Sequence, residues 1–411
     1  MAYKFTSSSE EDKEFPVISQ SLSFNQLTPK AAKHYHGLHE RVSDWNLHQV
    51  EKQLHIYYAT DYLDSHKEVF KKTNTSTLLE LTEDQKKYVQ DLQRFLEFDT
   101  DYEELWLKTS VVEKKLSVLR NKLEPISFLS QPVYFSKGEI FINTLDSFFQ
   151  LCMEAKQTRF QVSEGMFTSL LISLGQACCL TSSLCLHKQT RTSWNNLRGV
   201  AVKSQPECRF FNSRTFGNCA MLKPKAIVSV VEVKNGKRFG YTGLKHQERE
   251  SFSKRSKHSQ RRHQSRKRHR NSMEDSYTEE SYDSEINSGF SSSNNSSQIS
   301  DMSGNRIPEI ISYISSNTLA KHAGELLLDL HKYQSEPKVS NIMNLPGIIV
   351  DGTKVYFTML EMSESHHEKL DKNIQLNGSD KATVYYAKPL DILVQSDRDI
   401  IIENLVKLHN I

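Results

Sequence analysis

Residues 227–234 read Ile-Val-Ser-Val-Val-Glu-Val-Lys, a stretch in which β-branched residues dominate and two charged residues stand near the end. Such a nearly continuous apolar run predicts a strand buried inside a sheet. Because side chains alternate across a strand, Glu232 and Lys234 leave the same face about 7 Å apart. Burying either charge alone is costly. We therefore expect a partner group, a metal ion or a phosphate beside this carboxylate and this ammonium.

The segments around this strand alternate between helical and extended patterns. Helices are predicted within residues 29–122 and over 140–155, 165–186, 317–331 and 400–408; strands are predicted over 199–203, 208–211, 347–350, 354–360 and 384–386. Asp351-Gly352 has the sequence of a hairpin turn, and Thr82 with Gln85 has the pattern of a helix N-cap. This order predicts an α/β fold, with α+β as the alternative: a mixed central sheet with flanking helices, preceded by a helical N-terminal region.

The length of 411 residues exceeds what one hydrophobic core usually serves, so we expect more than one region. The predicted division is a disordered N-terminus (1–28), a helical region (29–135), the first part of the α/β domain (136–244), a disordered insertion (245–305) and the second part of that domain (306–411). The insertion is predicted from composition, because it is rich in Ser and charged residues and has almost no aliphatic ones. The 165–186 helix is expected to cover the central strand.

Positive charge is concentrated at the start of the expected insertion. The whole chain carries a formal charge of +3, but residues 245–270 hold 11 Lys/Arg against two Glu. The basic clusters consist of Lys254, Arg255, Arg261, Arg262, Arg266, Lys267, Arg268 and Arg270. Clusters of this kind are read by the nuclear import machinery and also bind phosphate backbones without sequence preference. We expect a nuclear or nucleo-cytoplasmic protein with nucleic acid as a partner; a plain solvated linker is the alternative.

Other sequence features narrow the class of protein. No apolar run approaches the ~20 residues of a membrane span, and the first residues lack an apolar signal core, so we expect no membrane partner. The six cysteines form no Cys-x-x-Cys pair and lie mostly in apolar surroundings, which predicts buried free thiols. The sequence carries no signal for an oligomeric state.

A second acidic group precedes the strand. Pro206-Glu207 stands 25 residues before Glu232, at the start of a predicted strand. Two carboxylates from neighbouring strands can hold Mg²⁺ through oxygen ligands, and a nearby lysine can stabilise negative charge on phosphorus. The arrangement Pro-acid, a gap, then Glu232-Val233-Lys234 resembles the PD-(D/E)XK nuclease superfamily, whose core is a helix, a three-stranded meander, a helix and further strands.

A further likeness lies downstream. Residues 321–328, Lys-His-Ala-Gly-Glu-Leu-Leu-Leu, and residues 346–357, which begin Pro-Gly-Ile-Ile-Val-Asp-Gly, are similar to the helix and hairpin of the eukaryotic, Crinkler-like branch of this superfamily. The resemblance implies a restriction-endonuclease-like fold and Mg²⁺-dependent cleavage of nucleic acid. It implies Glu207 and Glu232 as metal ligands, Lys234 as the group that orients water and stabilises the transition state, and Glu164 or Lys321 as accessory.

One alternative function is a scaffold. The first acid is Glu207 where aspartate is usual in the superfamily, and Lys225 follows Pro224 where an acid would also serve. A catalytically inactive, nuclease-derived interaction protein with a basic localisation tether would show the same departures and would need no metal. The two hypotheses differ in one spatial respect: catalysis requires the side-chain tips of Glu207, Glu232 and Lys234 to converge in a cleft.

Overall fold

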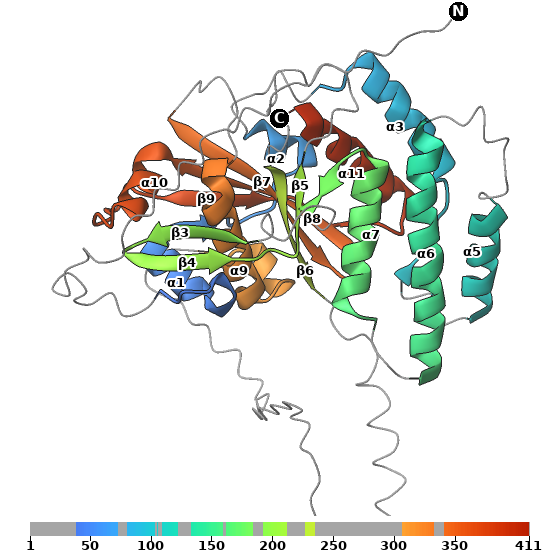
Figure 1. The fold of residues 1–411 in the computed structure, drawn as a ribbon, viewed down its shortest axis with the longest axis horizontal. Helices are drawn as coiled ribbons and strands as arrows, with labels where there is room; N and C mark the ends of the chain where they lie inside the picture. The colour runs from blue at the N-terminus through green and yellow to red at the C-terminus, as the bar shows by residue number, and fades with distance from the viewer. Residues whose placement is uncertain are drawn as a thin grey trace, which may run out of the picture.

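The computed structural model describes residues 38–72, 80–102, 105, 109–121, 133–158, 162–183, 192–211, 227–234, 306–332 and 341–410. These residues form a mixed α/β fold in which an eight-stranded sheet has helices on both faces (Figure 1). The predicted fold class is confirmed. The expected disordered N-terminus 1–28 and insertion 245–305, with its basic clusters, lie outside the described residues.

Ten strands are described. They are β1 Ile56–Tyr58, β2 Thr181–Ser182, β3 Ser193–Leu197, β4 Val200–Ser204, β5 Cys208–Phe211, β6 Ile227–Lys234, β7 Ile342–Asp351, β8 Lys354–Ser363, β9 Ala382–Tyr386 and β10 Leu390–Asp391. The main sheet has the order β1-β9-β8-β7-β6-β5-β2, β10 pairs with β8, and β3 and β4 form a separate hairpin. Strand β6 lies between antiparallel β5 and parallel β7. The prediction of a central strand over 227–234 is therefore confirmed.

Nine α-helices of four or more residues surround the sheet among the described residues. They are α1 Leu47–Leu54, α2 His66–Lys71, α3 Glu83–Phe95, α5 Thr109–Asn121, α6 Val133–Thr158, α7 Glu164–Ala177, α9 Ser316–Asp329, α10 Glu364–Asp371 and α11 Gln395–Lys407. The expected N-cap of α3 is present, because Thr82 and Gln85 form a capping box. No helix in this described part is long and apolar enough to cross a membrane.

Helix α7 ends earlier than the sequence predicts. Cys179 adopts a left-handed backbone conformation with φ of 65°. The N–H of Leu180 donates to the carbonyl of Gly175, and the N–H of Cys179 donates to that of Gln176. These two bonds form a Schellman motif, which terminates a helix. Glycine is the usual residue at this left-handed position, so a cysteine there gives no local signal that the helix ends. The expected helix over 165–186 is wrong for residues 178–183, and 184–186 lie outside the described residues.

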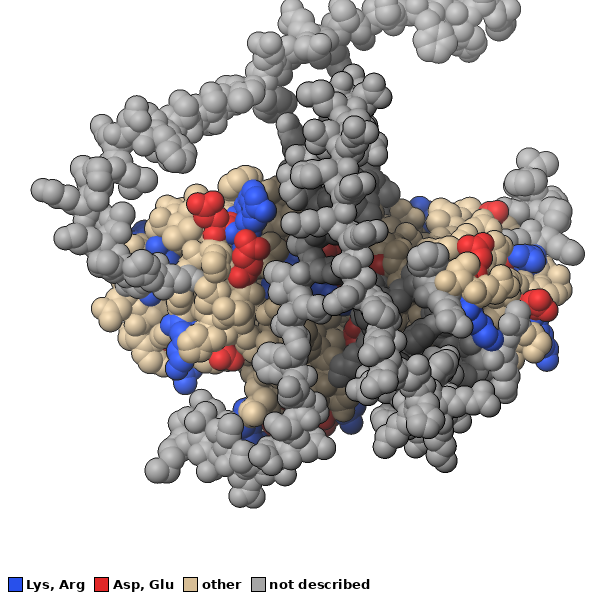
Figure 2. Space-filling view, turned by 90° about the horizontal axis from the view of Figure 1, so that it is seen from below, with Lys and Arg blue, Asp and Glu red and all other residues tan. Residues whose placement is uncertain are grey.

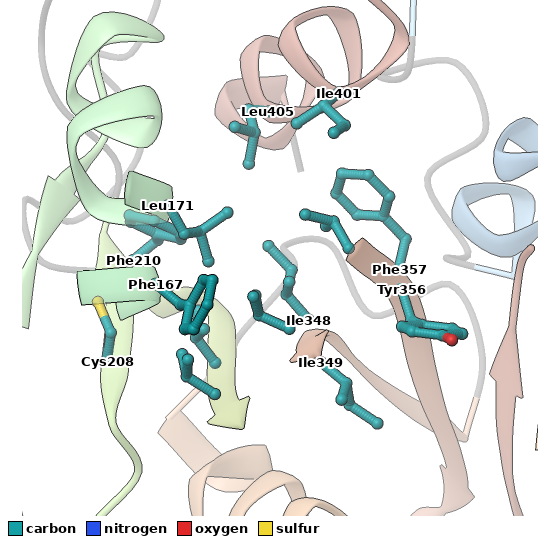
Figure 3. Packing of buried hydrophobic residues seen from close by; sticks show 14 of the residues in the cluster. Phe167, Leu171, Cys208, Phe210, Ile348, Ile349, Tyr356, Phe357, Ile401 and Leu405 are labelled. Atoms are coloured by element: carbon teal, nitrogen blue, oxygen red, sulfur yellow. The ribbon is translucent and has the colours of Figure 1, made fainter. Parts of the chain in front are cut away.

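The two faces of the central strands differ in polarity. Val231 and Val233 are buried on the face where α7 and α11 pack, and Figure 3 shows Phe167 and Leu171 of α7 and Ile401 of α11 gathered over that part of the core. The alternate residues of β6, Glu232 and Lys234, leave the opposite face, which α9 covers. The prediction that the 165–186 helix covers the central strand is therefore confirmed, because α7 packs on β6.

The sequence predicts a helical N-terminal region. Among its described residues this region contains helices and also one strand. It contributes β1, which pairs in parallel with β9 at the edge of the main sheet. The hydroxyl of Tyr58 on β1 donates to the carbonyl of Leu319 in α9, with an O···O distance of 2.8 Å. Trp45, before α1, is buried against Gly324 of α9. The first described residues thus share a core with the sheet and with α9.

Gly347 of β7 allows α9 to pack closely on the sheet. A Cβ there would lie 2.5 Å from Thr358 Oγ1 and 2.7 Å from His322 Nε2, two atoms that are themselves 2.8 Å apart in a buried hydrogen bond. We expect Gly347→Ala to destabilise the fold by about 1–3 kcal/mol, because it overpacks a full core. In urea denaturation, Gly378→Ala is the control: its Cβ would meet no atom within 4 Å. Equal midpoints for the two variants would contradict this packing.

Candidate functional site

The charged side chains of β5 and β6 meet across the antiparallel ladder. Cys208 pairs with Val231, so Glu207, one residue before Cys208, stands directly opposite Glu232. Side chains at directly opposed positions lie about 5 Å apart at Cβ, and two like charges there are destabilising. The fold therefore places two carboxylates where a cation has to lie between them.

Lys321 of α9 supplies that cation. Its Nζ lies 2.7 Å from Glu232 Oε2 and 3.1 Å from Glu207 Oε1. It also lies 3.7 Å from Oε1 of Glu325, one helical turn further along α9. One ammonium group is thus surrounded by three carboxyl groups that come from two strands and a helix.

Lys234 extends the cluster toward α7. Its Nζ lies 3.0 Å from Glu232 Oε1 and 4.0 Å from Oε1 of Glu164, which is in the first turn of α7. All five residues that the sequence singled out, Glu164, Glu207, Glu232, Lys234 and Lys321, therefore lie in one connected network. Glu207 joins Glu232 and Lys234 in this network through the ammonium of Lys321.

This network, which we call the Lys321 cluster (the five residues above and Glu325), has a buried floor and an open rim. Glu232 and Glu325 are fully buried, and the Lys321 side chain is 15% exposed. The rim side chains are partly exposed: Glu164 by 46%, Glu207 by 39% and Lys234 by 32%. A group in solution can therefore reach the rim. The floor is shielded from water, and charges interact more strongly in such a shielded place.

Burial and the surrounding charges set the protonation of the floor. Burial raises the pKa of Glu232, and Lys321 and Lys234 oppose this shift. Burial, together with the nearby charge of Glu232, raises the pKa of Glu325 well above its usual value. Burial alone would lower the pKa of Lys321, but the neighbouring carboxyl groups outweigh it and raise that pKa. Lys321 is therefore charged.

Two members of this region were not predicted as site residues. Glu325 follows Lys321 at i+4 on α9, a spacing that brings side chains together, so this signal could have identified it. Tyr58 is fully buried, and its pKa is raised by burial and by the charges of Glu325 and Glu232. No local signal identifies Tyr58, because it comes from β1 at the far edge of the sheet.

The oxygen donors of the cluster fit Mg²⁺ in kind. Glu207 and Glu232 both direct an oxygen at one point, and carboxylate oxygens are the ligands that Mg²⁺ prefers. Neither oxygen of buried Glu325 has a hydrogen-bond partner among the described residues. The ammonium of Lys321 stands at the shared point, and among the residues that the structure describes no set of three His, Cys, Asp or Glu side chains is arranged around a metal position.

The rest of the described surface shows no concentration of one charge on the face drawn in Figure 2. In the view of Figure 2, acidic and basic residues are interspersed among the other described residues. Two surface hollows of about 470 and 510 Å³ lie elsewhere, one between α5 and α6 and the other beside residues 306–312. Neither hollow is lined by a residue of the Lys321 cluster.

The chain was compared with known proteins at the levels of family, sequence and structure. No family model, no curated protein and no solved structure matches it.

Proposed function

We propose that this chain is a PD-(D/E)XK-like protein that acts on nucleic acid by Mg²⁺-dependent hydrolysis of phosphodiester bonds. One observation carries the proposal: Glu207, Glu232 and Lys234, the three residues that the motif implies, meet in one partly open cluster with Glu164 and Lys321. A Glu-x-Lys pair on a strand is common by chance. Its meeting with a third residue from a neighbouring strand is much more specific.

The order of elements also supports the proposal. Helix α7 is followed by the antiparallel series β2, β5 and β6, then by α9, and then by β7, which is parallel to β6. This is the helix, meander, helix and strand that the resemblance implies. The β3–β4 hairpin is inserted between β2 and β5 and pairs outside the main sheet. Fold alone does not establish activity, so the proposal rests on the side chains.

In this proposal Glu207 and Glu232 would hold the metal ion, which would supply positive charge to the phosphate and to the attacking water. Lys234 is at the rim, and its ammonium donates a hydrogen bond to a phosphate oxygen as that oxygen gains negative charge. The Glu232 carboxylate, 3.0 Å from the Lys234 ammonium, orients it. Glu164 lies on the other side of Lys234 and restricts the positions of its ammonium.

The proposed location is nuclear or nucleo-cytoplasmic. The support is the basic composition of residues 245–270, which suits both the import machinery and a phosphate backbone. In this proposal the basic segment raises affinity for nucleic acid of any sequence, and the Lys321 cluster cleaves it.

A second function is favoured by one specific observation. The ammonium of Lys321 already contacts both Glu207 and Glu232, so each of these two carboxylates has a cationic partner without any metal. A catalytically inactive scaffold derived from the same fold would use this ion-pair network for stability only.

Incubation of the purified full chain with end-labelled single-stranded DNA, double-stranded DNA and RNA tests the proposal. We expect cleavage of at least one of these with Mg²⁺ or Mn²⁺, and none with a chelator. We also expect binding that weakens as salt rises, because the basic segment releases counterions from the backbone. Salt-sensitive binding without cleavage under any metal condition would favour the scaffold.

A further inference from the structure

The ammonium of Lys321 occupies the point at which the carboxyl groups of the cluster converge. The Lys321 nitrogen lies 2.7 Å from an oxygen of Glu232, 3.1 Å from one of Glu207 and 3.7 Å from one of Glu325. An ion pair between exposed side chains adds little to the stability of a protein. Lys321 is largely buried, so these contacts make its ammonium the cation of the site.

The surrounding groups leave no room for two cations at this point. A bound Mg²⁺ holds carboxylate oxygens at about 2.1 Å and requires near-octahedral geometry. An ammonium 2.7 Å from Glu232 Oε2 and 3.1 Å from Glu207 Oε1 fills the same space between these oxygens. Two positive charges within a few ångströms in a shielded site also repel strongly.

Glu325 offers the ammonium an alternative position. It is fully buried on the same helix as Lys321, and neither of its oxygens has a hydrogen-bond partner in the described part of the chain. The two side chains are at i and i+4, and Lys321 Nζ lies 3.7 Å from Glu325 Oε1. Rotation of the flexible lysine stem can bring the ammonium onto this carboxyl group and away from Glu207 and Glu232.

We infer that Lys321 is the resident cation of the site, and that a divalent metal ion binds Glu207 and Glu232 only by displacing its ammonium toward Glu325. This inference rests on the proposed function and adds to it a competition between the Lys321 ammonium and the metal ion for the two carboxylates. Lys321 then determines the metal concentration at which the site fills, because each binding event must first break the contacts of its ammonium with the two carboxylates.

Metal titration of the full chain tests the competition without any substrate. The variant is Lys321→Met, which keeps a long apolar stem and removes the charge. The control is Lys369→Met, which breaks a similar, partly buried contact of 2.7 Å to Asp380 away from the site. The readout is the melting temperature as Mg²⁺ or Mn²⁺ is added to chelator-treated protein, since a ligand of the native state raises it.

We expect Lys321→Met to lower the half-saturating metal concentration at least tenfold, and Lys369→Met to leave it at the wild-type value. Addition of Glu232→Gln should abolish the response in both backgrounds. If Lys321→Met does not fold, Lys321→Met combined with Glu325→Gln removes a further carboxyl group and is titrated in its place.

Two results overturn the inference in distinguishable ways. If the metal response depends on Glu232 but is equal or weaker in the Lys321→Met background, the competition is wrong and the metal site of the proposed function stands. If neither background shows any response that depends on Glu232, both the competition and the metal-dependent function are wrong.

Discussion

Glu232→Gln is expected to abolish metal-dependent cleavage and the rise in melting temperature that Mg²⁺ produces. The amide has nearly the same size as the carboxylate but no charge, and Glu232 is fully buried at the centre of the cluster. Loss of an outer partner of a metal ligand already costs about 10–100-fold. We therefore expect a loss of at least about 100-fold from the ligand itself, measured as the initial rate on labelled nucleic acid.

Lys234→Ala is expected to separate cleavage from metal binding. An ammonium donates hydrogen bonds but is no ligand for a cation, so the variant should lose cleavage and keep its response to Mg²⁺. Glu361→Gln is the control for both variants, because Glu361 lies on β8 and contacts Tyr385 rather than the cluster. Cleavage that persists in Glu232→Gln, with the fold intact, would contradict the assignment of Glu232.

Asp329→Ala should have the largest effect on stability. Asp329 is the last residue of α9 and is fully buried, with Oδ2 2.5 Å from Nε of Arg209 on β5. Ser193 of β3 donates to Asp329 and accepts from Nη2 of Arg209 at 2.8 Å. Removal of one partner leaves a buried charge without its carboxylate, which typically costs about 3–5 kcal/mol. Urea denaturation should show this loss.

Two further variants identify the cause of that loss. Arg209→Met combined with Asp329→Leu removes both charges and should recover most of the stability, since apolar replacement of a buried pair is often neutral. Glu368→Ala breaks the exposed contact with Lys372 and should leave the urea midpoint unchanged. If the double variant is no more stable than Asp329→Ala, the uncompensated charge is not the reason for the loss.

Much of the fold was determined by local sequence. The β-branched run of β6 and the capping box at Thr82 form where the sequence predicts them. The hairpin between β7 and β8 also forms, but its turn is Gly352-Thr353, one residue later than predicted, because Asp351 pairs with Lys354. Each is specified within a few residues, by side-chain alternation, by turn chemistry or by satisfaction of the first helical N–H groups. The shared face of Glu232 and Lys234 follows from the same alternation.

Only the tertiary structure decided how the site is assembled. The partnership of Glu207 with Glu232 depends on the register of β5 on β6, and the central place of Lys321 depends on how α9 packs against that strand pair. Tyr58 donates a hydrogen bond to the Leu319 carbonyl of α9 because β1 joins the edge of the sheet. Such contacts join segments far apart in the chain, and no local periodicity encodes them. The packing of α9 places the ammonium of Lys321 between Glu207 and Glu232, where its positive charge offsets the repulsion between the two carboxylates.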